Sequence, residues 1–171
     1  MNAIEIHREG LRWAYDLLEM VMADVTPEMA HTQPPGIANP LAAIYAHAII
    51  DLDAIPNMVL HGQPARYQTD WSGKTGISEV QWQSDLAWAR RVRVDLPAAK
   101  AYGAAMFEAA DAWLSKLDEA ALAREVDLTG VGMGVHPVSW CISALITSHL
   151  NNMAGEISVL KGIQGAKGYP F

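Results

Sequence analysis

The chain has 171 residues and a mass of 18.6 kDa, which suffices for one domain with a hydrophobic core, residues 1–171, and leaves no room for a second. Hydrophobic residues make up 51% of the sequence and charged residues 18%, a composition that excludes a disordered chain. The formal net charge of -7 at pH 7 argues against nucleic acid as a partner, because phosphate backbones are bound by clustered Lys and Arg side chains.

Hydrophobic periodicity predicts a first helix over residues 3–24. Thr26-Pro27 is expected to end it, because the residue before a proline is disfavoured in helical conformation. After a proline-rich loop, Asn39-Pro40 is typical of an N-cap followed by a proline in the first turn, and it predicts a second helix over 40–61. Pro56 is expected to kink that helix or to unwind it locally.

Three more helices are predicted in the second half of the chain. Ser78 and Gln81 match a capping box, which predicts a helix over 79–94. The remaining expected elements are a helix over 97–117, a short turn at 118–122, an extended loop or hairpin over 124–137 and a helix over 137–161. Four long helices with one additional helix on a crossover make an all-α bundle.

Two of the six histidines, His47 and His149, lie on apolar helices beside the predicted inner faces. A buried imidazole needs a partner, and a lone one is more often a hydrogen-bonded core residue than a metal ligand. Two of them, each about halfway along a separate helix, favour a metal site, because bundle metal sites are built from side chains on facing helices. Asn152, Met153 and Glu156 follow His149 by three, four and seven residues and can share its helix face. Glu156 could complete a set of two histidines and a carboxylate, or it could simply be exposed near the helix end.

The sequence around these histidines resembles the DinB-like family. Residues 148–157 read Ser-His-Leu-Asn-Asn-Met-Ala-Gly-Glu-Ile. In DinB-like proteins a histidine is followed four residues later by a second histidine, one further residue, and then Gly and Glu or Gln. His47, in Leu-Ala-Ala-Ile-Tyr-Ala-His, matches the other histidine of the family on its second helix. The resemblance implies a DinB-like four-helix bundle in up-down-down-up order, often a homodimer, in which three histidines bind a divalent metal such as zinc or nickel.

This chain departs from the family pattern at Met153, which stands where the resemblance implies the third histidine. A thioether is a weak ligand for zinc or nickel, so the change is expected to weaken metal binding unless Glu156 or Asn152 replaces the missing histidine. The candidate metal ligands at this stage are therefore His47 and His149, with Glu156 as a possible substitute.

The resemblance implies a function but no specific substrate. Some characterised relatives transfer low-molecular-weight thiols or isomerise thiol adducts, and the metal lowers the pKa of the thiol. The chain is therefore expected to be a metal-dependent thiol transferase or hydrolase, with a small-molecule or thiol ligand in a pocket at the mouth of the bundle. The alternative is a non-catalytic dimeric bundle that binds a small ligand in the same cavity, with a metal site made degenerate by Met153.

The remaining signals are ordinary. Cys141 is the only cysteine and lies in an apolar stretch, which predicts a buried, unreactive thiol and a reducing compartment. The glycine-rich segment 130–134 is expected to form a flexible lip of the bundle mouth, and Trp71 and Trp140 are candidates to line a pocket. No signal peptide and no membrane-spanning run of about 18 apolar residues is predicted, which favours a cytoplasmic protein without a membrane partner.

Overall fold

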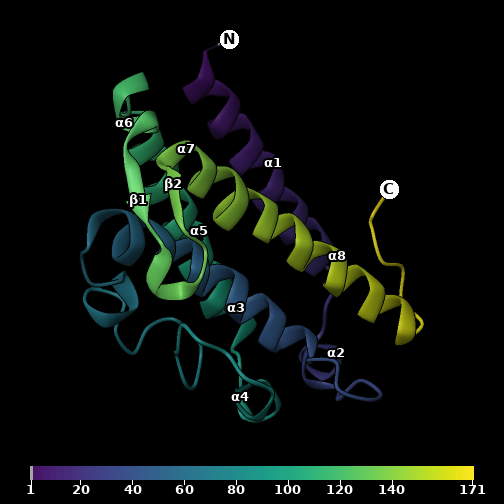
Figure 1. Cartoon of the computed structure of the whole chain (residues 1–171). Helices are drawn as coiled ribbons and strands as arrows, with labels where there is room; N and C mark the ends of the chain where they lie inside the picture. Colours follow the sequence, from purple (N-terminus) through teal and green to yellow (C-terminus); the bar gives the residue numbers. More distant parts are fainter. Residues whose placement is uncertain (1) are drawn as a thin grey trace.

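Four long helices form the body of the protein in a computed structural model that describes residues 2–171. They are α1 (Ala3–Met22), α3 (Leu41–Ala54), α5 (Leu96–Leu114) and α8 (Ser148–Ile163). Helices α1 and α8 run in one direction and α3 and α5 in the opposite one (Figure 1), which is the up-down-down-up order. The predicted all-α bundle is therefore confirmed.

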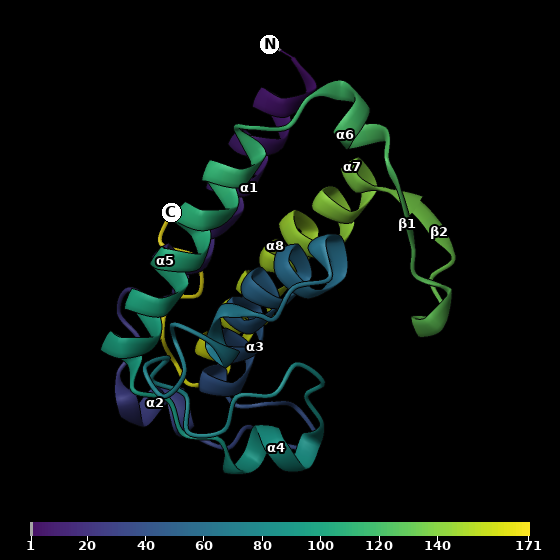
Figure 2. The ribbon, with the colours of Figure 1, turned by 90° about the vertical axis from the view of Figure 1, so that its left-hand side faces the viewer.

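Each long helix packs on two others. Helix α1 lies against α5 and α8, and α3 contacts the same two helices from the other side of the core (Figure 2). Helix α1 buries one face, whose residues recur every three or four positions: Leu11, Ala14, Tyr15, Leu17, Leu18, Val21 and Met22. Helix α3 differs, because all of its residues except His47 and Asp51 are buried. These two side chains form the partly exposed strip of α3.

Two π-helical segments widen the bundle at one end. Helix α3 continues into η1 (Ile55–Leu60), and η4 (Ile142–Thr147) lies between α7 (Val138–Cys141) and α8. Pro56 explains η1, because proline has no N–H with which to continue the α-helical ladder. The predicted disturbance at Pro56 thus takes the form of a widened turn. Nothing in the sequence of η4 explains its π-helical geometry.

The predicted helix over 79–94 is wrong over most of its length. Only α4 (Leu86–Arg91) is helical, and Asp85 caps it by accepting a hydrogen bond from a backbone N–H of its first turn at 2.7 Å. Ser78 does not cap a helix. Its hydroxyl instead accepts a hydrogen bond from the Arg93 N–H at 2.9 Å and ties the two ends of the segment together.

Two helix ends also differ from expectation. Asn39 does not cap the second long helix, whose N-cap is Pro40 without a side-chain hydrogen bond. Thr26 was expected only to follow the end of the first helix, but it also caps the short helix α2 (Pro27–His31). Its hydroxyl accepts a hydrogen bond from the Met29 N–H at 3.2 Å.

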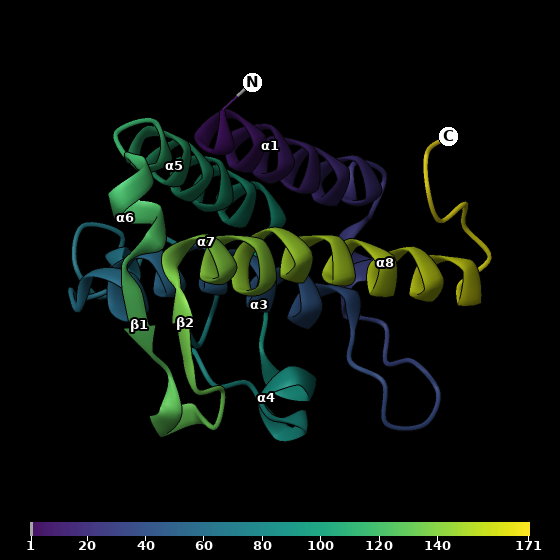
Figure 3. The same cartoon turned by 45° about the horizontal axis from the view of Figure 1, so that its top comes forward.

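Short elements complete the chain: η2 (Arg66–Gln68), α6 (Glu119–Ala123) and η3 (Thr129–Val131). The short turn expected at 118–122 is confirmed as α6, and the expected hairpin is confirmed as β1 (Glu125–Asp127) paired antiparallel with β2 (Val135–Pro137). The hairpin projects beside the bundle on the side away from α1 and α5 (Figure 3).

A buried carboxylate fixes the loop that follows η1. Asp53 is fully buried and accepts hydrogen bonds from the Tyr102 hydroxyl at 2.7 Å and from the backbone N–H groups of Arg66 and Tyr67, each at 2.9 Å. A carboxylate can be buried when several donors offset its lost hydration. Asp53 thereby joins α3, α5 and η2 behind the face that carries His47 and Asp51.

The segment Leu41–Leu60 is long and apolar enough, with a mean hydropathy of 1.2, to cross a membrane by composition alone. Within the protein 72% of it is buried, as expected for the core helix of a bundle. Packing therefore accounts for the apolar character of α3 and η1.

Candidate metal centre

Helix α3 presents His47 and Asp51 on one face because they are four residues apart. The Nε2 atom of His47 lies 3.7 Å from the Oδ2 atom of Asp51. On the other side of the His47 ring, Nδ1 lies 3.5 Å from the Ser84 hydroxyl oxygen. The imidazole is thus turned with Nε2 toward the carboxylate of its own helix.

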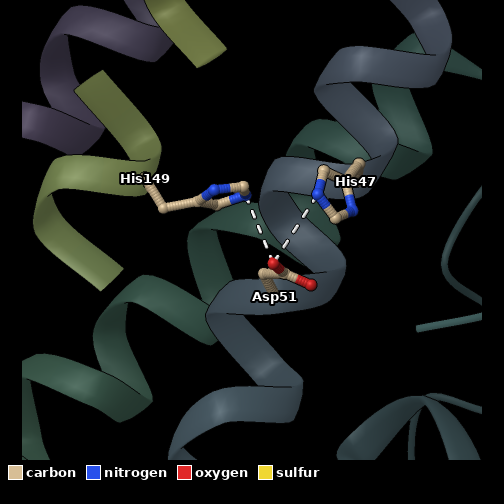
Figure 4. Close-up of side chains that lie close together, drawn as sticks. All are labelled: His47, Asp51 and His149. Carbon is tan, nitrogen blue, oxygen red and sulfur yellow. Dashed lines mark ion pairs between the residues drawn. The ribbon is translucent and has the colours of Figure 1, made fainter. Parts of the chain in front are cut away.

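His149 reaches the same carboxylate from α8. Its Nε2 atom lies 3.2 Å from Oδ2 of Asp51, and its ring stands edge-on to that of His47 with the centroids 4.9 Å apart. Figure 4 shows both imidazoles directed at the Asp51 side chain. One ligand atom from each of the three residues lies within 4.8 Å of the others. The prediction that His47 and His149 face each other across the bundle agrees with this geometry.

Two atoms of this cluster that could donate electron pairs to a metal have no hydrogen-bond partner among residues 2–171. They are Oδ1 of Asp51 and Nε2 of His149, and both are buried. The 3.2 Å approach between His149 and Asp51 therefore brings two electron-rich atoms together without hydrogen-bond geometry. Unsatisfied buried polar atoms are rare and destabilising. Atoms that converge in this way are suited to a shared cation.

Burial controls the protonation of the cluster. It raises the pKa of Asp51 to about 7, an effect that the nearby Trp82 side chain partly opposes. It lowers the pKa of His149 to about 4, with a further contribution from nearby His47, and it lowers the pKa of His47 as well. Both imidazoles are therefore neutral at physiological pH, which is the form that binds metals.

The residues present fit a divalent metal. Two imidazole nitrogens and one carboxylate oxygen are a common ligand set for catalytic zinc and for other divalent transition metals. Three protein ligands leave coordination positions free for a substrate or water, as catalytic sites require.

The other predicted ligands lie outside this cluster. Met153 is 9% exposed and lines a small depression with His47 and Glu156. Glu156 is exposed on α8, and so is Asn152. The carboxylate that joins the two histidines is thus Asp51, from the same helix as His47.

The sequence interpretation missed Asp51, although a signal for it was present. An acidic residue four positions after His47 on an otherwise apolar helix must lie on the same face as that histidine. The substitutes predicted for the missing histidine, Glu156 and Asn152, both lie on the helix of Met153. The structure instead brings together three candidate ligands from two helices, His47 and Asp51 from α3 and His149 from α8.

A cavity of about 360 Å³ opens beside Asp51 and His149. Residues from η1, η4 and the hairpin tip line it, including Gly130 and Met133 of the predicted glycine-rich lip. Trp82 lines the cavity, whereas the expected pocket residues Trp71 and Trp140 pack on Tyr102 and His136, respectively.

Cys141 is fully buried, as predicted, and burial raises the pKa of its thiol.

Comparisons with known proteins agree with this fold. The family model of the DinB superfamily matches residues 11–154. A crystal structure of a conserved protein from Enterococcus faecalis has a TM-score of 0.80 to this chain, over 96% of this chain and 99% of that one, at 17% sequence identity. At this identity the likeness concerns the fold alone. No curated protein sequence matches the chain significantly.

Proposed function

The chain belongs to the DinB superfamily, and from that premise we propose that it is a divalent-metal-dependent enzyme, a hydrolase or a thiol transferase, that uses zinc or nickel. The observation that carries the proposal is the convergence of His47, Asp51 and His149, with buried donor atoms that lack hydrogen-bond partners. A cluster of this kind destabilises the metal-free fold, and a bound cation offsets that cost.

A divalent ion at this position would supply Lewis-acid chemistry and lower the pKa of a water or thiol that reaches it. The protein's own side chains provide the rest. His47 and His149 offer neutral nitrogens, and Asp51 supplies the negative charge once its proton is released. Ser84, 3.5 Å from Nδ1 of His47, suits the outer position that orients a ligating imidazole.

The cavity beside the cluster supports the proposal that the protein is an enzyme. It meets Asp51 and His149 and leads to the hairpin tip, so a substrate can approach the free coordination positions. Mostly apolar walls reduce the access of bulk water and strengthen electrostatic interactions within the site.

A second candidate function is a non-catalytic bundle, in solution a dimer, that binds a small ligand in the same cavity. Met153 favours it, because this side chain stands beside His47 where the family pattern has a histidine. The two candidates differ in whether the cluster holds a metal.

Metal affinity of the Asp51→Asn and Glu156→Gln variants tests the proposal. Zinc and nickel are titrated into chelator-treated protein in competition with a chromophoric chelator. Loss of a direct ligand is expected to weaken binding in Asp51→Asn by about 100-fold or more, while the exposed control Glu156→Gln stays within about twofold of wild type. Metal binding that depends on Glu156 and survives Asp51→Asn would overturn the assignment of the ligands.

Activity separates the two candidate functions. Metal-loaded wild-type protein is assayed for hydrolysis of neutral esters and for transfer of small thiols to electrophiles, with Asp51→Asn in parallel. The enzyme proposal expects turnover that requires the ion and disappears in the variant. Tight metal binding without turnover in either assay would contradict the enzyme proposal, and the absence of both metal binding and turnover would favour the non-catalytic candidate.

A further inference from the structure

The cavity beside the metal cluster is apolar over most of its wall. Besides Asp51 and His149, its lining includes the apolar side chains of Ile55, Val59, Leu128, Met133, Leu145 and Trp82. They come from η1, the hairpin, η4 and the loop before α4. These apolar residues therefore come from four segments that are distant in sequence, and Gln83 and Asp127 are the other polar residues of the lining.

The charges of the wall select against anions. None of the residues that line the cavity is Lys or Arg, and the acidic ones are Asp51 and Asp127. Asp127 is already engaged, because its carboxylate accepts hydrogen bonds from the N–H and the hydroxyl of Thr129 at 2.9 and 2.6 Å. In the metal-free protein a carboxylate, phosphate or sulfonate would thus lose its hydration without gaining a cationic partner, and it would face two acidic groups.

The π-helical geometry of both helices serves this cavity. Ile55 and Val59 belong to η1, and Ala144 and Leu145 belong to η4, so each widened turn contributes wall residues. Single π-helical turns are frequent at functional sites, where the extra residue changes the direction of side chains. Pro56 accounts for η1, so η4, which the sequence does not explain, is the turn that favours a binding site here.

The lip of the cavity leaves apolar surface for a ligand to cover. Val131 and Met133, at the hairpin tip, are 58% and 48% exposed although both line the cavity. Gly132 and Gly134 flank Met133 with φ angles of 78° and 81°, a region that glycine adopts at little cost. The tip thus presents apolar side chains on a backbone that can adjust around a ligand.

We infer that the cavity binds a neutral, largely apolar small molecule with a single polar group that points to Asp51 and His149. Its volume of about 360 Å³ lies near the lower end of ligand pockets, which suits a molecule of two or three rings. As the substrate class of the enzyme this inference rests on the proposed function and on the apolar walls, because a bound divalent ion would attract an anionic group. Binding of the apolar part requires no metal.

The test uses two dyes with the same aromatic skeleton, neutral N-phenyl-1-naphthylamine and its anionic sulfonate, 8-anilinonaphthalene-1-sulfonate. Each is titrated into metal-free wild-type protein with chelator present. The dye is excited at wavelengths longer than those that tryptophan absorbs. Saturable binding of the neutral dye at one site is expected, with about tenfold or greater weakening for the sulfonate.

Two tryptophan substitutions on η4 locate the site. Leu145→Trp fills the cavity and is expected to weaken binding of the neutral dye by about tenfold or more. Ser143→Trp, an exposed position on the same segment that does not line the cavity, is the matched control and should bind within about twofold of wild type. Thermal unfolding of both variants confirms that they fold.

Equal binding of the two dyes would overturn the choice of a neutral ligand, and dye binding that Leu145→Trp leaves unchanged would overturn the site. Failure of the metal proposal has a different signature. In that case zinc and nickel do not bind, while the chelator-treated protein still binds the neutral dye and Leu145→Trp still blocks it.

Discussion

The Oδ2 atom of Asp51 on α3 lies 3.2 Å from the Nε2 atom of His149 on α8, yet neither side chain donates a hydrogen bond to the other. Both atoms are acceptors when His149 is neutral and its proton lies on Nδ1. In that tautomer, and with Asp51 ionised, the contact is unfavourable in the metal-free protein and becomes favourable when a cation lies between the two atoms. This relationship links the stability of the fold to metal binding.

Replacement of Asp51 by leucine is expected to stabilise the metal-free protein. The substitution removes a largely buried carboxylate with an unpartnered oxygen and fills a similar volume with apolar atoms, which is expected to raise the free energy of unfolding by about 1–2 kcal/mol. Urea unfolding with chelator present measures the change. With excess zinc the order should reverse, because only the wild type gains stability from the ion. A loss of stability in chelator would contradict the account.

A histidine at position 153 is expected to strengthen the metal site. Met153 lines the depression beside His47, and a third imidazole there would add a strong nitrogen donor for nickel and zinc. Met153→His should therefore raise the affinity for either ion by about tenfold or more. Met153→Leu, which keeps the apolar character and adds no donor, serves as the control. Equal affinities for the two variants would show that position 153 does not reach the ion.

Tyr102→Phe is expected to weaken the fold without affecting metal stoichiometry. The change removes the hydroxyl that donates to fully buried Asp53 at 2.7 Å, and a charged acceptor left short of a donor costs about 1–3 kcal/mol. The free energy of unfolding from urea titration measures the loss. If the ratio of zinc to protein fell as well, Asp53 and Tyr102 would be part of the metal site, contrary to the present account.

Glu19 on α1 is expected to make stability depend on pH. Burial raises the pKa of its carboxyl above the ordinary value of 4.5, although Tyr45, which donates its hydroxyl at 2.6 Å, Lys100 and Tyr15 all oppose the shift. The folded state therefore binds the proton more tightly than the unfolded state. Its stabilising contribution is complete at low pH and is lost as pH rises through the raised pKa.

Glu19→Gln isolates this effect, because the amide oxygen can still accept the Tyr45 hydrogen bond but cannot ionise. The free energy of unfolding of the wild type relative to the variant should fall as pH is raised from about 4 to about 7. Urea titrations at intervals across that range give the difference. A difference that stays constant with pH would mean that Glu19 titrates normally in the folded protein.

The sequence allowed the bundle and half of the candidate site to be predicted. Apolar periodicity located the four long helices, and the midpoints of two of them placed His47 and His149 opposite each other. Asp51 was overlooked because the missing ligand was sought around Met153, on the other helix. The helix expected over 79–94 failed for a different reason: Ser78 forms its hydrogen bond with distant Arg93, a contact that local sequence cannot reveal.

Anomalous X-ray scattering from crystals soaked in zinc tests the central claim most directly. Data collected on either side of the zinc absorption edge locate the ion without reference to activity. The account predicts one strong peak within about 2.0–2.2 Å of a nitrogen of His47, a nitrogen of His149 and an oxygen of Asp51. No peak at this position, or a peak at Glu156 in its place, would contradict it.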